Sequence, residues 1–237
     1  MNLILLDNED FFPDASNRVR IKGRRLEHAR KVFKASAGDE LTVGRLNGDM
    51  GSGMVTAISR EAMEMTVKLD RPPPPPLPVT LILALPRPKM MNRILQAVSS
   101  MGVKQLYIIN SWRVEKSFWD SPKLEVEAIR EQLILGLEQG KDTILPEVHI
   151  RRLFKPFVRD ELPGIIKDSL ALIAHPLADE TLPQQTKGPV ALAVGPEGGF
   201  ISREVETFEE IGFKRVTLGE RILRVETAVP ALLSRFL

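Results

Sequence analysis

The sequence contains no cysteine, and among its 237 residues it has only one tyrosine, two tryptophans and three histidines. Without cysteine the chain can form no disulfide, no thiolate metal site and no cysteine nucleophile, which is typical of proteins of a reducing compartment. The histidines, His28, His149 and His175, show no metal-ligand spacing, and no carboxylate cluster joins them. We therefore expect no metal ion in this protein.

The sequence also lacks a long apolar run and a basic leader. No segment approaches the roughly 20 apolar residues that a transmembrane helix needs. The first ten residues carry Asp7, Glu9 and Asp10, whereas a secretory signal begins with a basic region. With 43% hydrophobic and 27% charged residues, the composition is ordinary for a soluble globular protein. We expect a soluble cytoplasmic protein that does not bind membranes.

Basic residues are concentrated near the N-terminus, although the formal net charge is only +2. Between Arg18 and Lys34 there are eight basic residues and a single acidic one, Glu27. Such a local excess favours a polyanionic partner, while a solvated helix face is the alternative interpretation. Aromatic residues do not run through this stretch in the way that single-strand binders use them. We therefore expect contacts to phosphates rather than to bases.

A proline-rich stretch, residues 72–78, divides the sequence. Successive prolines cannot donate the hydrogen bonds of a helix or a sheet, and they favour a stiff, extended spacer. Before this stretch, alternating segments and turn signals predict several strands and one helix, Gly23–Lys34. The predicted strands are Leu3–Leu6, Glu40–Gly44, Gly53–Ile58 and Glu64–Leu69, with turns at Ala37–Asp39 and Asn47–Gly48. This pattern indicates a small, barrel-like β domain.

Beyond residue 78, apolar strands alternate with helical segments. A continuous apolar run such as Val79–Leu85 is typical of a strand buried on both faces of a parallel sheet. The other predicted strands are Lys104–Ile109, Ser169–Ala174, Val190–Val194 and Lys214–Leu218. The predicted helices are Lys89–Met101, Ser121–Gln139, Ser202–Gly212 and Arg224–Phe236. The alternation predicts an α/β domain with a mainly parallel sheet.

Three loops that follow predicted strands have unusual sequences. Gly195–Phe200 reads Gly-Pro-Glu-Gly-Gly-Phe, Leu218–Arg224 reads Leu-Gly-Glu-Arg-Ile-Leu-Arg, and the third loop begins with His175 and Pro176. Open parallel sheets bind ligands beyond the carboxyl ends of their strands, so these loops could form one pocket. The glycine-rich loop matches neither a P-loop nor a dinucleotide-binding fingerprint, and alone it could be a simple turn.

As a pair, the two glycine-containing segments resemble those of SPOUT-superfamily RNA methyltransferases, most closely the RsmE family. The second segment continues in the family pattern as Val225-Glu226-Thr227-Ala228. Other segments follow the family order: Arg24–His28 with Gly38-Asp39, Lys89–Gly102, Trp112-Arg113, Glu138-Gln139 and Leu145–Glu147. The chain departs from the family at Val225, where threonine is usual, at Lys141, where arginine is common, and at Ser100-Met101, where Glu-Leu is usual.

The resemblance implies a fold, a cofactor and a reaction. Residues 1–71 would form a PUA-like β-barrel that binds RNA, residues 72–78 a linker, and residues 79–237 a SPOUT methyltransferase domain with a C-terminal trefoil knot. The family methylates N3 of a uridine in small-subunit (16S) ribosomal RNA, using S-adenosyl-L-methionine bound in the knot, and dimerises through that region. We therefore expect ribosomal RNA or the small ribosomal subunit as the partner, and a homodimer.

The resemblance also assigns site residues. The expected cofactor-binding residues are His175, Pro176, Gly195, Pro196, Glu197, Gly198, Gly199, Leu218, Gly219, Ile222, Leu223 and Arg224. Because N3 of uracil is a poor nucleophile until its proton leaves, we expect Glu197 or Glu226 as the base. Arg224 is expected to stabilise the uracil anion or to bind a phosphate. A structural ion pair is the alternative role for Arg221, Arg224 and Glu226, and a helix cap is a further one for Glu226.

The expected RNA-binding residues extend from the N-terminal cluster into the second domain. They are Arg18, Arg20, Lys22, Arg24, Arg25, Arg30, Lys31, Arg87, Lys89, Arg93 and Arg113. Two other functions remain open from the sequence alone. The chain could be a non-catalytic RNA-binding assembly factor, or a SPOUT methyltransferase that modifies another RNA or a ribose.

Overall fold

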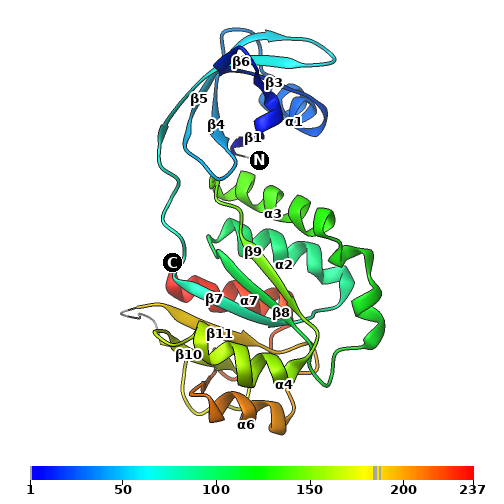
Figure 1. Cartoon of the computed structure of the whole chain (residues 1–237), viewed down its shortest axis with the longest axis vertical. Helices are drawn as coiled ribbons and strands as arrows, with labels where there is room; N and C mark the ends of the chain where they lie inside the picture. Colours follow the sequence, from blue (N-terminus) through cyan, green and yellow to red (C-terminus); the bar gives the residue numbers. More distant parts are fainter. Residues whose placement is uncertain (1, 184–185, 187) are drawn as a thin grey trace. The chain divides into compact units, whose positions relative to one another are not determined.

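The computed structural model describes residues 2–183, 186 and 188–237, and the chain divides into two compact units (Figure 1). The first unit comprises Met1–Pro75 and Ile134–Leu145, and the second comprises Pro76–Leu133 and Pro146–Leu237. The sequence suggested a single break at residues 72–78. It did not anticipate that Ile134–Leu145 belongs with the N-terminal residues.

The first unit is built on a six-stranded sheet with the strand order β1-β4-β5-β6-β3-β2. Its strands are β1 (Ile4–Leu6), β2 (Phe11–Phe12), β3 (Ala15–Ile21), β4 (Glu40–Arg45), β5 (Met50–Ile58) and β6 (Met63–Arg71). β1 pairs with β4 in parallel, and the other neighbouring strands are antiparallel. The helix α1 (Gly23–His28) and the π-helical turn η2 (Ala29–Phe33) follow β3, and they bury Leu26 and Ala29 in the core of the sheet.

The predicted helix and four of the strands lie where the sequence placed them, but β2 and β3 were not predicted. In β3, Val19 and Ile21 are fully buried, whereas Arg18 and Arg20 are exposed. Successive side chains of a strand point to opposite faces, so this alternation is that of a half-buried strand. The sequence interpretation treated the arginines as a charge cluster and overlooked the apolar residues between them.

The segment Ile134–Leu145 packs against the strands of the first unit. Leu137 is fully buried in a cluster with Leu3 and Met50. The backbone N–H groups of Asn2 and Leu3 both donate to the Glu138 carbonyl, at 2.8 and 3.0 Å. These contacts make the segment part of the core of this unit, although more than 60 residues of sequence separate it from β6.

A buried carboxylate in this segment depends on one arginine. The Glu138 side chain is only 1% exposed. Arg24 of α1 binds it with two parallel hydrogen bonds, Nη1 to Oε2 at 2.7 Å and Nη2 to Oε1 at 3.0 Å. Such a bidentate pair compensates for the loss of water around the carboxylate.

The second unit contains a six-stranded sheet with the order β12-β10-β11-β7-β8-β9, in which all neighbouring strands are parallel. The strands are β7 (Val79–Ala84), β8 (Gln105–Ile109), β9 (Glu147–Arg151), β10 (Leu170–Ala174), β11 (Val190–Val194) and β12 (Lys214–Val216). The middle strands are apolar and buried, as the sequence predicted. This confirms an α/β unit with a parallel sheet.

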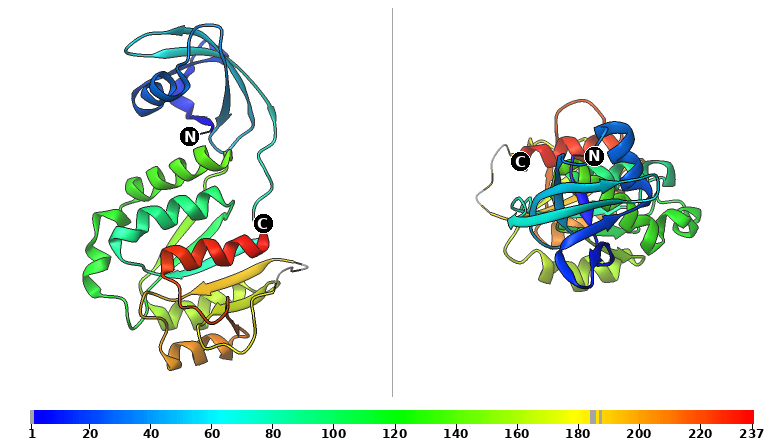
Figure 2. Two further views of the ribbon diagram at one scale, coloured as in Figure 1. Left: turned by 180° about the vertical axis from the view of Figure 1, so that it is seen from behind. Right: turned by 90° about the horizontal axis from the view of Figure 1, so that it is seen from above.

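Helices cover both faces of this sheet. α2 (Pro88–Ser100) and α7 (Val225–Leu233) lie on one face, and the short helix α4 (Phe154–Pro156) and α6 (Ser202–Glu210) lie on the other (Figures 1 and 2). α3 (Val126–Gly140) contributes its residues up to Leu133 to this unit. Among the described residues, no helix is long and apolar enough to cross a membrane.

Three features of this unit differ from the prediction. β9 and the helical turns of residues 154–165 were not predicted, because β9 is a short edge strand with few apolar residues. The long helix was expected to begin at Ser121. Instead, Ser121 Oγ caps a single 3-10 turn, η4 (Pro122–Leu124), by accepting from the Lys123 N–H at 3.3 Å, and α3 begins only at Val126.

The ion pair between Arg24 and Glu138 yields a stability prediction. Arg24→Ala leaves a buried carboxylate without its cation, and we expect a loss on the order of 3 kcal/mol in the free energy of unfolding. The matched control is Lys31→Ala, which removes an exposed pair with Glu27 and should cost about 0.5 kcal/mol or less. Urea denaturation of both variants measures the difference. Equal effects of the two substitutions would contradict the role of the buried pair.

Candidate active site

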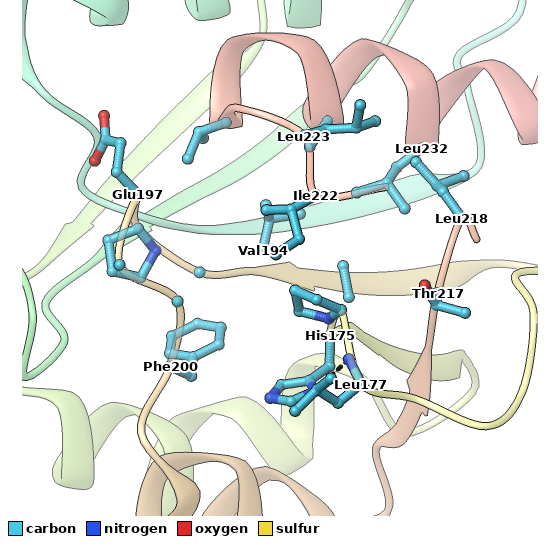
Figure 3. A pocket seen from close by; sticks show the side chains of 18 of the residues that line it. His175, Leu177, Val194, Glu197, Phe200, Thr217, Leu218, Ile222, Leu223 and Leu232 are labelled. Atoms are coloured by element: carbon cyan, nitrogen blue, oxygen red, sulfur yellow. Dashed lines mark hydrogen bonds between the residues drawn. The ribbon is translucent and has the colours of Figure 1, made fainter. Parts of the chain in front are cut away.

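Three loops meet in one cavity of about 350 Å³ at the carboxyl end of the parallel sheet (Figure 3). β12, β10 and β11 are neighbours in the sheet, so the loops that follow them start side by side. Ten of the expected cofactor residues line the cavity: His175, Pro176, Gly195, Pro196, Glu197, Gly198, Gly199, Leu218, Ile222 and Leu223. The described residues that line the cavity do not include the other two expected cofactor residues, Gly219 and Arg224, or the expected catalytic residue Glu226.

The glycine-rich loop after β11 is closed by a tight turn. The Gly199 N–H donates to the Pro196 carbonyl at 2.8 Å, and Gly199 has a φ of +72°, which side-chain-bearing residues rarely adopt. A Cβ at Gly198 would lie 2.9 Å from Cδ of Arg113, whose guanidinium donates to the Gly198 carbonyl. At the start of the loop, a Cβ at Gly195 would lie 3.0 Å from the backbone nitrogen of Phe200. The glycines therefore allow a close approach of backbone and of Arg113.

Glu197 fastens this loop to the neighbouring strand end. Its Oε1 accepts a hydrogen bond from the backbone N–H of Arg87 at 2.9 Å. Arg87 is the N-cap of α2 and follows β7, the other neighbour of β11 in the sheet. In Figure 3 the carboxylate accordingly points to the edge of the cavity, away from its centre. Glu197 thus contributes to the cavity wall and also ties two loops together.

His175 follows the end of β10, in surroundings that favour its neutral form. Burial, and next the positive charge of Arg215, lower the pKa of this imidazole below its usual 6.5. The backbone N–H of Leu177 donates to Nδ1 at 3.2 Å, which requires Nδ1 to be unprotonated. Both observations favour a neutral imidazole whose Nδ1 accepts a hydrogen bond from the Leu177 N–H and whose single proton is on Nε2.

The loop after β12 and the helix α7 form the apolar side of the cavity. Val225, Ala228 and Leu232 of α7 line it, and Leu223 and Leu232 lie opposite His175 in Figure 3. The sequence missed these helix residues because their spacing is that of an ordinary core-facing helix. Ile222 is 80% exposed although it lines the cavity, so the rim offers apolar surface that a ligand would cover.

A second buried carboxylate joins the loop after β8 to α6. Glu204, 6% exposed, accepts from the Trp112 N–H with Oε1 at 2.8 Å and from the Ile201 N–H with Oε2 at 3.0 Å. The sequence did not predict this carboxylate as a site residue. It also did not predict that Arg113, expected to contact RNA, donates to the glycine-rich loop and lines the cavity.

Most cations of the N-terminal cluster form ion pairs within the first unit. Glu64 lies 2.6 Å from Arg20 and 3.7 Å from Arg18, Asp10 binds Arg25 at 2.5 and 2.8 Å, and Lys31 contacts Glu27 at 3.1 Å. Arg24 binds Glu138, as described above. Lys22, Arg30 and Lys34 are exposed, and no ion pair is found for them among the described residues. Of the residues expected to bind RNA, Lys22 and Arg30 are therefore the most available to a phosphate.

The structure also brings an aromatic ring to this cluster, which the sequence did not predict. The guanidinium groups of Arg18 and Arg20 lie 4.7 and 4.9 Å from the centre of the Phe12 ring. Phe12 precedes the basic stretch and reaches it only because β2 pairs with β3. The signal that could have found it is the Phe11-Phe12 pair in a sequence with few aromatic residues.

The basic residues of the second unit lie near the start of α2. Arg87 is its N-cap, Lys89 and Arg93 lie in its first two turns, and all three are exposed. Arg113 is exposed as well and contacts the glycine-rich loop. Within the described ranges, no three histidine, aspartate or glutamate residues come together in a way that could hold a metal ion.

Comparison with known proteins identifies relatives for nearly the whole chain. Residues 73–237 match the family model described as an RNA methyltransferase domain. The ribosomal RNA small subunit methyltransferase E of Treponema pallidum is 30% identical over 98% of this chain and 88% of its own length. A protein from Borreliella burgdorferi, ribosomal RNA small subunit methyltransferase E 1, is 23% identical over 98% of this chain and 95% of its own length.

A solved structure shares the fold. The ribosomal RNA small subunit methyltransferase E of Neisseria gonorrhoeae, crystallised with bound S-adenosyl methionine, superposes with a TM-score of 0.75 at 23% identity, covering 99% of this chain and 95% of that one. The matched family model spans the unit that carries the cavity, and the full-length relatives extend the match to the first unit. The chain therefore belongs to the ribosomal RNA small subunit methyltransferase E (RsmE) family of RNA methyltransferases.

Proposed function

We propose that this protein transfers a methyl group from S-adenosyl-L-methionine to N3 of a uridine in small-subunit ribosomal RNA. The observation that carries the proposal is the single cavity into which the loops after β10, β11 and β12 converge. The names of its relatives and the methyl donor bound to a protein of the same fold support it. A ribosomal substrate would place the protein in the cytoplasm.

The cavity suits the methyl donor in size and chemistry. Its volume of about 350 Å³ is within the range of small-molecule sites. Leu218, Ile222 and Leu223 supply apolar walls for an adenine ring, and the backbone of residues 195–199 supplies hydrogen-bonding groups close to the ligand. When bound, S-adenosyl-L-methionine would supply an electrophilic methyl group on a positively charged sulfur.

The residues of the chain have to align the uracil and remove its proton. N3 gains the methyl carbon as the sulfur–carbon bond breaks, and the proton of N3 passes to a base. Of the expected groups, Glu197 lines the cavity, whereas Arg224 is the N-cap of α7 and Glu226 lies in its first turn. We assign Glu197 or Glu226 to the proton, and Arg224, together with Arg113 at the cavity, to the negative charge that develops on uracil.

The proposed function extends to the fold of each unit and to the assembly of the protein. We propose that the first unit is a PUA-like RNA-binding barrel and that the C-terminal part of the second unit is a trefoil knot. The position of β11 between β7 and β10, and the packing of α7 against α2, agree with such a threaded chain. We also propose a homodimer, as the resemblance to the RsmE family implies.

Two measurements separate this function from the alternatives. Calorimetry should detect binding of S-adenosyl-L-methionine, and its absence would leave a non-catalytic RNA-binding protein. Mass spectrometry of unmodified small-subunit RNA, incubated with protein and donor, should find N3-methyluridine. A methyl group on a ribose instead, or no product on this RNA despite donor binding, would point to another methyltransferase specificity.

A substitution at the start of the glycine-rich loop should abolish donor binding. In Gly195→Val, the new Cβ would meet the Phe200 and Gly199 backbone at 3.0 and 3.3 Å and displace the loop. We expect the affinity for S-adenosyl-L-methionine to fall by about 100-fold or more, and RNA affinity to stay unchanged. The control is Gly164→Ala, where a Cβ would meet nothing within 4 Å. Normal donor affinity of Gly195→Val, measured by calorimetry, would argue against this loop as the site.

The lowered pKa of His175 yields a prediction about pH. Because folding favours the neutral imidazole, the unfolded chain takes up more protons just below its own pKa of 6.5. The contribution of His175 to stability is thus fully present above about pH 6.5 and is lost as the pH falls through the lower folded value.

His175→Asn tests this prediction, since the Asn Oδ1 can still accept from the Leu177 N–H but does not titrate. Urea unfolding between about pH 7.5 and about pH 5.5 should show a steeper loss of stability in the wild type than in the variant. Parallel pH profiles of the two proteins would rule out a half-buried neutral imidazole at this position.

A further inference from the structure

We infer that Trp112 stacks against an unpaired base of the RNA substrate beside the methyl-transfer cavity. Trp112 is 80% exposed, although it is the largest apolar side chain type in the protein. An indole that stays exposed to water does not contribute the favourable free energy of its burial to folding. Such a residue indicates a binding surface. The inference rests on the proposed function and adds to it a residue that positions the substrate.

The backbone that carries Trp112 is fixed, while its side chain projects into solvent. The Trp112 N–H is held by the buried carboxylate of Glu204 at 2.8 Å. One residue earlier, Ser111 is 4% exposed and its carbonyl accepts from the Val114 N–H at 3.1 Å. One residue later, Arg113 donates to the Gly198 carbonyl. A rigid support of this kind lowers the entropy cost of binding a flat ligand on the indole.

The other tryptophan of the same loop shows that this segment can bury an indole. Trp119 is 9% exposed, and its Nε1 donates to Asn110 Oδ1 at 3.1 Å. The Arg152 guanidinium lies 5.3 Å from its ring centre. The Trp119 indole therefore has a hydrogen-bond acceptor and a guanidinium neighbour within the protein. The indole of Trp112, seven residues earlier, is exposed and available to an external partner.

The position of Trp112 identifies that partner as a nucleobase. Arg113, its neighbour, lines the cavity in which the methyl group would be transferred. The exposed cations Arg87 and Lys89 flank the same edge of the sheet, since Arg87 is bound by Glu197 of the glycine-rich loop. Unpaired RNA bases are commonly recognised by stacking on aromatic side chains next to cations that contact phosphates. An indole with these neighbours is suited to hold the target uracil or the base next to it.

The first experiment measures steady-state methylation of unmodified small-subunit RNA by Trp112→Ala and Trp112→Phe. For Trp112→Ala, we expect the KM for RNA to rise by roughly 5- to 150-fold, the loss of one base–aromatic stack, with kcat within a factor of a few. Trp112→Phe should recover most of the affinity because phenylalanine also stacks. Donor affinity should be unchanged in both. The control is Val126→Ala, an apolar side chain of the same unit that is 74% exposed, which should leave the KM unchanged.

The second experiment observes the indole directly. Acrylamide should quench the fluorescence of exposed Trp112 but hardly that of buried Trp119. A uridine-rich single-stranded oligonucleotide should reduce the quenching of Trp112. Trp112→Phe should show almost no acrylamide-quenchable tryptophan fluorescence. Unchanged quenching in the presence of the oligonucleotide, or a wild-type KM for Trp112→Ala, would overturn the inference.

The test also separates this inference from its rivals. If sedimentation shows that Trp112→Ala changes the oligomeric state while RNA affinity is retained, the indole is a subunit contact and the inference fails. If the wild-type protein protects Trp112 with the oligonucleotide but produces no N3-methyluridine, base stacking stands and the proposed reaction is wrong. If it methylates the RNA and Trp112 stays unprotected, the reaction stands and the stacking role is wrong.

Discussion

The candidate site depends on one constraint, the parallel pairing of β11 with both β7 and β10. Parallel pairing directs every strand of the second unit toward the same edge, so all the loops that follow the strands begin there. β11 follows β10 in the sequence but lies between β7 and β10 in the sheet. Its five residues, Val190–Val194, are all buried, which leaves the glycine-rich loop as the first part of this segment to reach the surface. The cavity is thus a product of sheet topology before any individual side chain is considered.

Carboxylates then fix the loops at this edge through backbone N–H groups. Glu197 holds the N-cap of α2, and Glu204 holds both the loop after β8 and the start of α6. A carboxylate that accepts from backbone N–H groups makes stronger hydrogen bonds than a neutral acceptor. The arrangement explains why a glycine-rich, flexible sequence can still form a defined wall. It also means that these glutamates support geometry, whatever further part they have in proton transfer.

The sequence predicted the regular parts of the fold and the three loops that share the cavity, because both follow from local patterns. Buried strands such as Val79–Ala84 appear as apolar runs, and the loops that follow them are marked by glycine and proline. β3 was missed because Arg18 and Arg20, which alternate with Val19 and Ile21, were interpreted as part of a charge cluster. The start of α3 was misplaced because a serine–proline pair caps a 3-10 turn as well as it caps an α-helix.

Long-range contacts could not be predicted from local patterns. Nothing near Glu138 in the sequence indicates that it binds Arg24, and the exposure of Trp112 beside a cavity is a property of the folded chain alone. The expected catalytic residues show the same limit. Glu197 lines the cavity, but Arg224 and Glu226 lie at the start of α7, outside its wall as formed by the described residues.

The ion pairs of the N-terminal cluster change what its charge can do. Seven cations there were assigned to RNA, yet five of them already face a carboxylate of their own unit. A cation releases counterions from RNA only to the extent that it neutralises a phosphate. If only Lys22 and Arg30 of these seven neutralise phosphates, the logarithm of the RNA affinity should fall with the logarithm of the salt concentration with a slope of roughly −1 to −2 from these residues. Seven contacts to a single strand would instead contribute a slope of roughly −5. Most of this positive charge therefore maintains the shape of the surface on which the nucleic acid would rest.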